Sequence, residues 1–357
     1  MAYARQLDMT NDSRLFRSAE ELEDAGAYPV AGGAFERGNA RFLPLMVGRS
    51  VHLFDHRLAS VMEDDAEEVE AADEPADAPP RRATCTRRTH NPYSSRQTTP
   101  DEHADPTFNP RPRYWVEDSE LAERWPEGLD WAVAFRDIAR PTDIRTVIAC
   151  VVPRAAFGNT LPLLLPALPD RPRGKPPTPQ AMALWRVACQ PIIADYKQSA
   201  ALLLGNLGAL ALDYVARNKV QSAHLNSYIL EQLPMAPRIG FARRFGQRRA
   251  EEIVREEVLA LSYTAHDLAP FARDQGCQDP PFVWDAEDRL RRRARLDAVF
   301  MLLYGLDQAA ARHVLDTFPI LRRQEESRHD GRFRTRDLVL RFMAAMEAGN
   351  PDARVAG

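Results

Sequence analysis

"IADYKQSAALLLGNLGALALDYVARNKVQSAHLNSYILEQLP" (residues 193–234) is an apolar segment that turns abruptly polar and closes on a proline. Between residues 193 and 215 the apolar residues follow the period of a helix and occupy most of its sides. One stripe of this helix consists of Leu203, Leu207, Leu210 and Tyr214. Because a helix that is apolar on most sides is buried, the pattern predicts a central helix on which the rest of the fold packs.

A polar segment connects this helix to a shorter one. Asn226 is suited to cap the N-terminus of a helix over "SYILEQL", and Pro234 ends that helix. The polar side chains of the connection are Arg217, Asn218, Lys219, Gln221, Ser222, His224 and Asn226. A solvated connection between helices is the simplest interpretation. The alternative is contact with nucleic acid, because Arg, Asn and Gln pair with base edges and Lys holds phosphate.

Two β-type runs precede the central helix. They extend from Val147 to Val152 and from Leu161 to Leu165. A polar elbow that contains Arg154, Gly158 and Asn159 joins them. Residues 41–61 carry apolar residues at mixed spacing, which indicates a further strand or turn running into a short helix.

Helical patterns dominate after Pro237. We expect helices over 249–261, 286–304, 308–317 and 336–348. The predicted fold is therefore α+β: a small mixed β-sheet packed by the central apolar helix, followed by a mainly helical C-terminal unit.

The composition is that of a folded protein. Of 357 residues, 45% are hydrophobic, which suffices for at least one large core. The net charge of -4 argues against a uniformly basic nucleic-acid coat, so charge has to be assessed locally. The four cysteines, Cys85, Cys150, Cys189 and Cys277, are too scattered for paired metal ligands and imply no disulfide framework. The first residues lack a signal-peptide pattern and no apolar run reaches about 18 residues, so we expect a cytoplasmic protein without membrane contact.

Four stretches resemble one protein family. "LLGNLGALALDYVARNKVQSAHLNSYILEQLPMAP" (203–237) is similar to the specificity region of N6-adenine DNA methyltransferases of restriction-modification and phage-defence systems, including the fused type IIG enzymes. Its helix, loop, helix and "QLP" ending also resemble type I specificity subunits. The C-terminal part of the same methyltransferases resembles "FLPLMVGRSVHLFDHRLAS" (42–60), "FRDIARPTDIRTVIACVVPRAAFGNTLPLLL" (135–165), and "YTAHDLAPFARDQG" with "LDAVFMLLYGLDQAAARHVLDTFPILRR" (263–276 and 296–323). The chain departs from the family at Val47, Gly208 and the pair Gln221 and Ser222, where the family has an acidic residue, Ser and two glycines.

The resemblance implies a target-recognition domain that reads double-stranded DNA. This domain begins in residues 1–61 and continues over 106–240, and a helical C-terminal domain follows over 241–357. Residues 62–105 segregate acidic from basic charge with few apolar residues, which predicts a disordered charged insertion. The predicted DNA-binding residues are the polar loop residues named above together with Arg154 and Asn159.

The catalytic half of a class I methyltransferase is not recognisable. Such an enzyme needs a glycine-rich turn for S-adenosylmethionine and a tetrapeptide of the "NPPY" kind that holds the flipped adenine. The sequence has no "FxGxG", and the tetrapeptide Asp279-Pro280-Pro281-Phe282 follows polar "RDQGCQ", not an apolar strand. We therefore expect a non-catalytic chain without cofactor or metal, whose partner is a separate catalytic domain or chain that binds S-adenosylmethionine. The alternative is a compact or degenerate adenine-N6 DNA methyltransferase that uses this tetrapeptide.

Weaker patterns suggest other chemistry. Asp170 with Asp195 and Lys197 loosely mimics a metal-dependent nuclease, but a proline-rich loop and a helical pattern replace the strands that it needs. His52 and His56 share one helical face, as some zinc ligands do, without a third ligand at metal spacing. A run of arginines, consisting of Arg291, Arg292, Arg293 and Arg295, indicates either phosphate contact or a solvated helical face.

Overall fold

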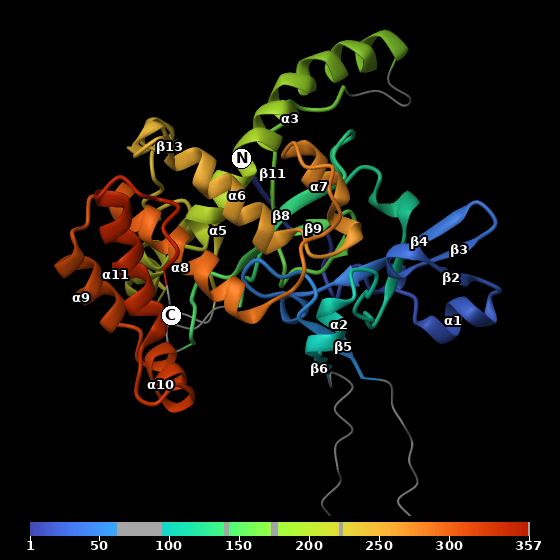
Figure 1. Ribbon diagram of the computed structural model, residues 1–357. Coiled ribbons are helices and arrows are strands. Elements are labelled where there is room, and N and C mark those ends of the chain that lie inside the picture. The colour runs from blue at the N-terminus through green and yellow to red at the C-terminus, as the bar shows by residue number, and fades with distance from the viewer. Residues whose placement is uncertain (63–94, 139–142, 173–177, 221–223, 356–357) are drawn as a thin grey trace, which may run out of the picture.

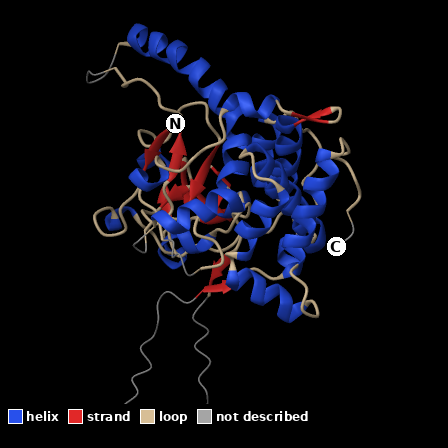
Figure 2. Ribbon diagram, turned by 90° about the vertical axis from the view of Figure 1, so that its left-hand side faces the viewer, coloured by secondary structure: helices blue, strands red, loops and turns tan. Residues whose placement is uncertain are grey.

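The computed structural model describes residues 1–62, 95–138, 143–172, 178–220 and 224–355. The fold is α+β, as the sequence predicts. Small sheets from the N-terminal two thirds of the chain lie beside a group of C-terminal helices (Figures 1 and 2).

The first sheet is antiparallel and almost wholly buried. Its strands follow the spatial order β1 (Ala2–Ala4), β11 (Leu163–Leu165), β8 (Trp131–Phe135) and β9 (Ala149–Pro153). Val133 of β8 lies opposite Val151 of β9 and Leu164 of β11. The two β-type runs predicted around the elbow are β9 and β11, and β8 separates them.

A second sheet is built around β4 (Ala40–Met46). Its other strands are β2 (Tyr28–Val30), β3 (Ala34–Arg37), β7 (Trp115–Glu117) and β10 (Ala156–Phe157). β10 runs parallel to β4, with Phe157 opposite Met46, and the remaining pairs are antiparallel, so this sheet is mixed. The strands that were expected in one sheet are divided between these two sheets, because the chain turns at Arg154 after β9 and continues into the second sheet as β10.

The region expected to be a disordered insertion, 62–105, ends in ordered structure. The ordered elements next to it and within it are β5 (Ala59–Val61), β6 (Ser95–Gln97) and α2 (Pro100–Ala104). β5 and β6 form an antiparallel pair, and the Thr99 hydroxyl caps α2. The expectation was therefore wrong for residues 95–104, where cap chemistry and strand pairing outweigh a polar composition. Residues 63–94 lie outside the described residues.

Short helices complete the N-terminal part. They are η1 (Ser13–Leu15), α1 (Ala19–Asp24), η2 (Ala31–Gly33), η3 (Gly48–Ser50) and η4 (Asp118–Leu121). The Ser18 hydroxyl and the Glu21 carboxylate cap α1 reciprocally. The residue before the cap, Arg17, forms a backbone bridge with Trp115 of β7 and so attaches the N-terminal segment to that strand.

The predicted central helix is broken. In place of one helix over 193–215 there are α3 (Pro179–Leu207) and α4 (Leu210–Lys219), with a bend of 68° between them. At Gly208 an added Cβ would lie 2.5 Å from the ring of Phe54, so the chain passes this ring only where a side chain is missing. The first half of α3 projects from the rest of the protein (Figure 1). Among the residues that the structure describes, no single helix is long and apolar enough to cross a membrane, and only the bent pair of α3 and α4 meets that test of length and composition together.

Two buried carboxylates hold α4 in place. Asp297 accepts the N–H of Leu210 at 2.7 Å and so caps the start of the helix from another element. Asp213 accepts the N–H groups of Thr146 at 2.9 Å and Val147 at 2.7 Å. α4 is thereby attached to the chain that enters β9.

Helices dominate after residue 240, as predicted. The elements are η5 (Arg238–Ala242), β12 (Arg244–Phe245), β13 (Arg248–Arg249), α6 (Ala250–Ser262), η6 (His266–Leu268), α7 (Ala269–Asp274), α8 (Ala286–Leu303), α9 (Gln308–Asp316), α10 (Pro319–Arg328) and α11 (Arg334–Glu347). The four predicted helices are α6, α8, α9 and α11. The sequence did not predict α7, which has only six residues, or α10, which buries none of its residues and so lacks an apolar stripe.

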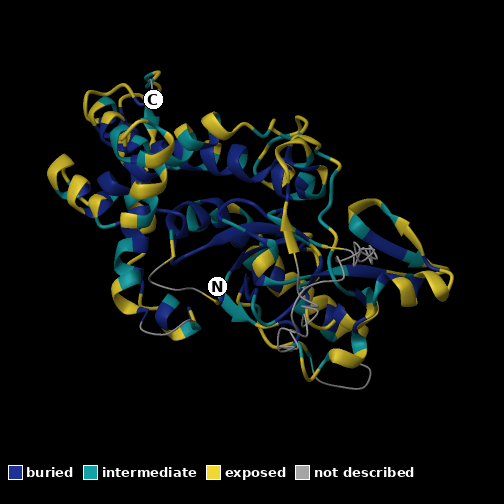
Figure 3. Cartoon of the chain, turned by 90° about the horizontal axis from the view of Figure 1, so that it is seen from below, coloured by how far each residue is buried: buried dark blue, intermediate teal, exposed yellow. Residues whose placement is uncertain are grey.

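The largest hydrophobic core joins the first sheet to the helices. Its buried cluster includes Trp131 of β8, Leu204 of α3, Phe300 of α8 and Met343 of α11. The sheet around β4 packs mainly on two smaller clusters. Figure 3 shows the buried residues in dark blue on the inner faces of strands and helices, with exposed residues at the periphery. The predicted boundary near residue 240 does not divide the largest core, because residues on both sides of it belong to the same cluster.

Candidate nucleic-acid interface

The polar segment that the sequence predicts to be a loop begins in the last turn of α4, at an arginine that is bound by the protein itself. Arg217 Nη2 donates to the carbonyl oxygens of Asp143 at 2.6 Å and Ile144 at 2.5 Å, and Nε lies 3.4 Å from the Asp213 carboxylate. Its guanidinium lies 4.3 Å from the centroid of the Phe318 ring, and the side chain is only 12% exposed. Arg217, predicted to contact DNA, here fixes the start of the loop to residues 143–144.

The loop ends on the segment that follows β8. His224 and Ile138 form an antiparallel bridge, and the N–H of Leu225 donates to the Asp137 carbonyl at 2.6 Å. His224 Nδ1 lies 2.9 Å from the buried carboxylate of Asp137, while the imidazole remains 52% exposed. The two ends of the loop are thus attached to the chain after β8, one to residues 143–144 and the other to residues 137–138.

Asn226 starts the short helix α5 (Ser227–Leu230), as predicted. Its side chain accepts no amide of the helix, so the expected side-chain cap is wrong. The backbone carbonyl of Asn226 takes that role by accepting the N–H groups of Ile229 at 3.0 Å and Leu230 at 3.1 Å. The half-buried Asn226 amide group therefore lies outside the hydrogen bonds of the helix.

Two further predicted loop residues, Asn218 and Lys219, also lie in the last turn of α4, and their side chains are exposed. Asn218 Nδ2 donates to the Tyr214 carbonyl at 2.8 Å, and Lys219 Nζ lies 3.5 Å from the side-chain oxygen of Gln232. The contact of Lys219 is long, so its ammonium stays at the surface. Gln221 and Ser222, the other predicted members of the loop, lie outside the described residues.

Only the second half of the elbow after β9 contacts the chain that holds the loop. Arg154 pairs with Asp118 of η4 at 2.5 Å, and both side chains are on the surface. Asn159 is half-buried in the turn after β10, and the carbonyl of the next residue, Thr160, accepts the N–H of Asp137 at 3.1 Å. Elbow and loop therefore meet through Asp137.

A cleft of about 760 Å³ opens next to Thr160. Its walls come from five segments: the chain before and within α1, the end of β4 with η3, the base of the β5–β6 pair, the chain before β7 and the chain after β8. Two of the stretches that resemble methyltransferases, 42–60 and 135–165, contribute to these walls.

The inner wall depends on a glycine. The N–H of Gly48 donates to Thr160 Oγ1 at 3.0 Å, and a Cβ on Gly48 would lie 2.7 Å from the Thr160 carbonyl oxygen. Only a residue without a side chain allows this approach of two backbones. Gly48 thus joins η3 to the elbow at the cleft.

The cleft is amphipathic, with three arginines against two carboxylates. The arginines are Arg49, Arg113 and Arg136, and the carboxylates are Glu21 and Asp143. Arg136 Nε donates to the Val51 carbonyl at 2.8 Å, and burial lowers the pKa of its guanidinium, which still stays charged.

An aromatic group forms part of the cleft wall. The Tyr114 ring stacks on Phe16 at 5.8 Å with an angle of 24°, and the Arg113 guanidinium lies 5.0 Å from the centre of Tyr114. The residues that line the cleft were not predicted as site residues. Two sequence features pointed to them: Arg49 and Arg136 lie within stretches that resemble the methyltransferases, and "RPRYWV" places a basic residue next to an aromatic one.

The alternative catalytic tetrapeptide lies elsewhere. Asp279 to Phe282 occupy an exposed segment without secondary structure between α7 and α8, and the N–H of Phe282 donates to the Tyr263 carbonyl at 2.9 Å. The element before it is a helix, so the tetrapeptide does not follow the apolar strand that the catalytic version caps.

The weaker patterns have intramolecular partners. Asp195 binds Arg238 at 2.7 Å, and Lys197 binds Asp274 at 3.0 Å. His56 Nε2 lies 2.9 Å from Asp267. Within the described ranges, no group of three or more His, Cys, Asp or Glu side chains is placed to hold a metal ion.

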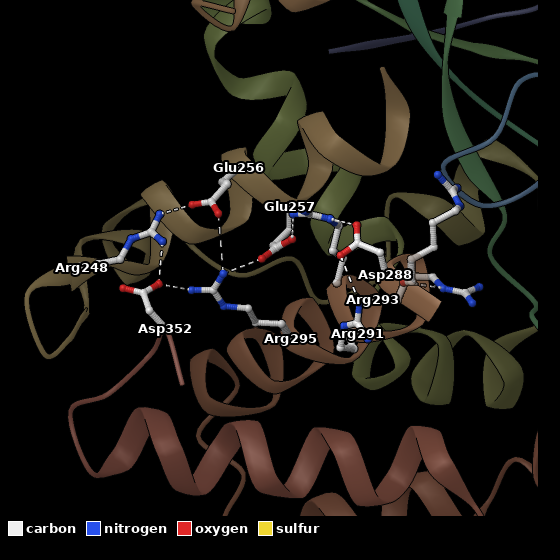
Figure 4. A network of polar contacts seen from close by, with 10 residues as sticks. Arg248, Glu256, Glu257, Asp288, Arg291, Arg293, Arg295 and Asp352 are labelled. Atoms are coloured by element: carbon white, nitrogen blue, oxygen red, sulfur yellow. Dashed lines mark hydrogen bonds and ion pairs between the residues drawn. The ribbon is translucent and has the colours of Figure 1, made fainter. Parts of the chain in front are cut away.

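The arginines of α8 belong to a network of ion pairs (Figure 4). Arg295 binds Glu257 at 2.6 Å and Asp352 at 2.5 Å, and Arg292 binds Glu257 at 2.8 Å. Two arginines together keep the Glu257 carboxylate paired although burial raises its pKa. These side chains tie α6, α8 and the C-terminal segment together, which is a structural use of the charge.

No family model, no curated protein and no solved structure matches this chain.

Proposed function

We propose that the chain is the sequence-specific DNA recognition part of a site-specific adenine DNA methyltransferase of a restriction-modification or phage-defence system. It acts in the cytoplasm with a separate catalytic domain or chain that binds S-adenosylmethionine. The chain itself carries out no methyl transfer in this proposal.

One observation carries the proposal. The stretches 42–60, 135–165 and 203–237 resemble the family in sequence, and they converge in space on the cleft and the loop. The hydrogen bond from Gly48 to Thr160 joins 42–60 to 135–165, and the contact of His224 with Asp137 joins 203–237 to 135–165.

The exposed side chains are suited to different parts of DNA. Lys219 presents a mobile charge suited to phosphate, and Asn218 and His224 present polar groups suited to base edges. The hydrogen bond from Asn218 to the Tyr214 carbonyl and the contact of His224 with Asp137 hold these two polar groups in place, so they lose little conformational freedom on binding DNA.

The test is binding of the purified chain to a pool of randomised DNA duplexes, followed by selection and a salt series on the selected duplex. We expect salt-dependent binding, an enriched sequence, and a salt slope that falls by about one unit in Lys219→Ala. Lys197→Ala is the matched control, because Lys197 lies on α3 and is paired with Asp274 of α7. The proposal fails if wild-type protein retains no duplex at low salt.

A further inference from the structure

The cleft has the dimensions of a small-molecule site. Its volume of about 760 Å³ falls within the range of roughly 300–1,000 Å³ that is usual for ligand pockets. A groove that only follows a DNA backbone does not need a cavity of this volume. The cleft therefore suits a compact group that enters it.

The walls suit the base of a nucleotide. Tyr114, which stacks on Phe16, and the Arg113 guanidinium near its ring line one side of the cleft. Unpaired bases stack on aromatic rings and on arginine planes of this kind. Hydroxyl groups that can hydrogen-bond to a base edge come from Thr10, Ser13, Ser50 and Ser95.

The charges suit a phosphate attached to that base. Arg49, Arg113 and Arg136 line the cleft from three segments, and arginine holds phosphate through paired hydrogen bonds. Arg136 is fixed by its hydrogen bond to the Val51 carbonyl, so one of the three cations is already oriented.

We propose that this cleft binds a single unpaired nucleotide, with its base on the Tyr114 side and its phosphate among the arginines. The nucleotide comes either from DNA, as a unit turned out of the helix, or from solution as a mononucleotide. The first source rests on the proposed function, and the second does not.

Two titrations test the inference on the full chain. The first measures heat of binding for the four deoxynucleoside monophosphates, the matching nucleosides and inorganic phosphate. The second places 2-aminopurine at successive positions of the selected duplex, because this base becomes fluorescent when it leaves the stack. We expect a monophosphate to bind more tightly than its nucleoside, or one duplex position to brighten on binding.

Variants assign the signal to the cleft. Arg49→Ala should weaken the signal roughly 10- to 100-fold, as loss of a charge-assisted hydrogen bond does. Ser13→Trp places a bulky ring at the exposed edge of the cleft and should abolish the signal. Arg41→Ala is the control, since Arg41 lies exposed on β4 outside the cleft and should leave the signal unchanged.

The outcomes separate the two proposals. Duplex binding without any nucleotide signal in either titration overturns the cleft assignment and leaves the proposed function standing. A nucleotide signal that Ser13→Trp and Arg49→Ala leave intact also overturns it. Mononucleotide binding that both variants reduce supports the cleft even if no duplex is bound.

Discussion

The substitution Arg217→Ala distinguishes a structural role of Arg217 from a role in DNA contact. Arg217→Ala removes two hydrogen bonds to the carbonyls of Asp143 and Ile144 and the contact with the Phe318 ring. A hydrogen bond from a charged group contributes about 1.5–3 kcal/mol and a cation–π contact about 0.5–2 kcal/mol. Because such terms are not additive, we expect a loss of about 2–4 kcal/mol in the free energy of unfolding.

Arg217→Lys should lie between the wild type and Arg217→Ala. An ammonium cannot reproduce the planar fork that reaches both carbonyls and lies over the ring, so we expect a loss of about 1–2 kcal/mol. Urea unfolding followed by circular dichroism measures the loss through the transition midpoint. Arg154→Ala is the control, because the pair of Arg154 and Asp118 is on the surface and contributes about 0–1 kcal/mol.

DNA binding provides the refuting result. If Arg217→Ala unfolds within about 0.5 kcal/mol of the wild type but lowers the salt slope of DNA binding by about one unit, Arg217 is a phosphate contact. The structural role assigned to its hydrogen bonds with the Asp143 and Ile144 carbonyls would then be wrong. A variant that loses stability and retains the wild-type salt slope confirms the structural role.

Three further changes test the elements that position the site. Gly208→Ala should cost about 1–3 kcal/mol in urea unfolding, because its Cβ would lie 2.5 Å from the Phe54 ring, whereas Gly240→Ala, whose Cβ would meet only Pro237 at 3.8 Å, should be neutral or slightly stabilising. Burial raises the pKa of Asp297 from 3.8 to about 6, so its contribution to stability is present below pH 4 and is lost as the pH rises to about 6. Asp297→Asn abolishes this titration, and its stability relative to the wild type should rise by about 2 kcal/mol between pH 4 and pH 6, with a flat difference as the contradicting result. Tyr196→Phe leaves the buried N–H of Val133 without the phenol oxygen that accepts it at 2.9 Å and should cost about 1–3 kcal/mol, while Tyr228→Phe on the exposed side of α5 should cost nothing measurable.

The sequence predicted those elements whose signal is local. α8 and α11 carry apolar residues at helical spacing over many residues, so their bounds were found to within a few positions. β9 and β11 are short apolar runs between polar turns, which also need no distant partner to be recognised. The α+β class follows from these elements alone.

What the sequence did not predict depends on distant residues. The break between α3 and α4 falls at Gly208, where the Phe54 ring, far upstream in the sequence, occupies the space that a side chain would need. The division into two sheets depends on the parallel pairing of Phe157 with Met46. No periodicity within either segment reports such a contact.

The candidate site shows the same limit. Composition indicated the exposed polar groups of the loop, such as Asn218 and Lys219, but not that Arg217 is bound to backbone carbonyls. The cleft was missed as a whole, because its arginines come from segments around residues 49, 113 and 136 that only the fold brings together.

The loop and the cleft are both supported by the chain after β8. Asp143 lines the cleft and accepts a hydrogen bond from Arg217 with its carbonyl oxygen. Asp137 binds His224 through its carboxylate and the elbow residue Thr160 through its N–H. Because these residues contact both features, we expect a nucleotide in the cleft to change the affinity of the chain for DNA, and we expect Arg217→Ala and His224→Ala to reduce that change. Equal DNA affinity of the wild type with and without the nucleotide would contradict this expectation.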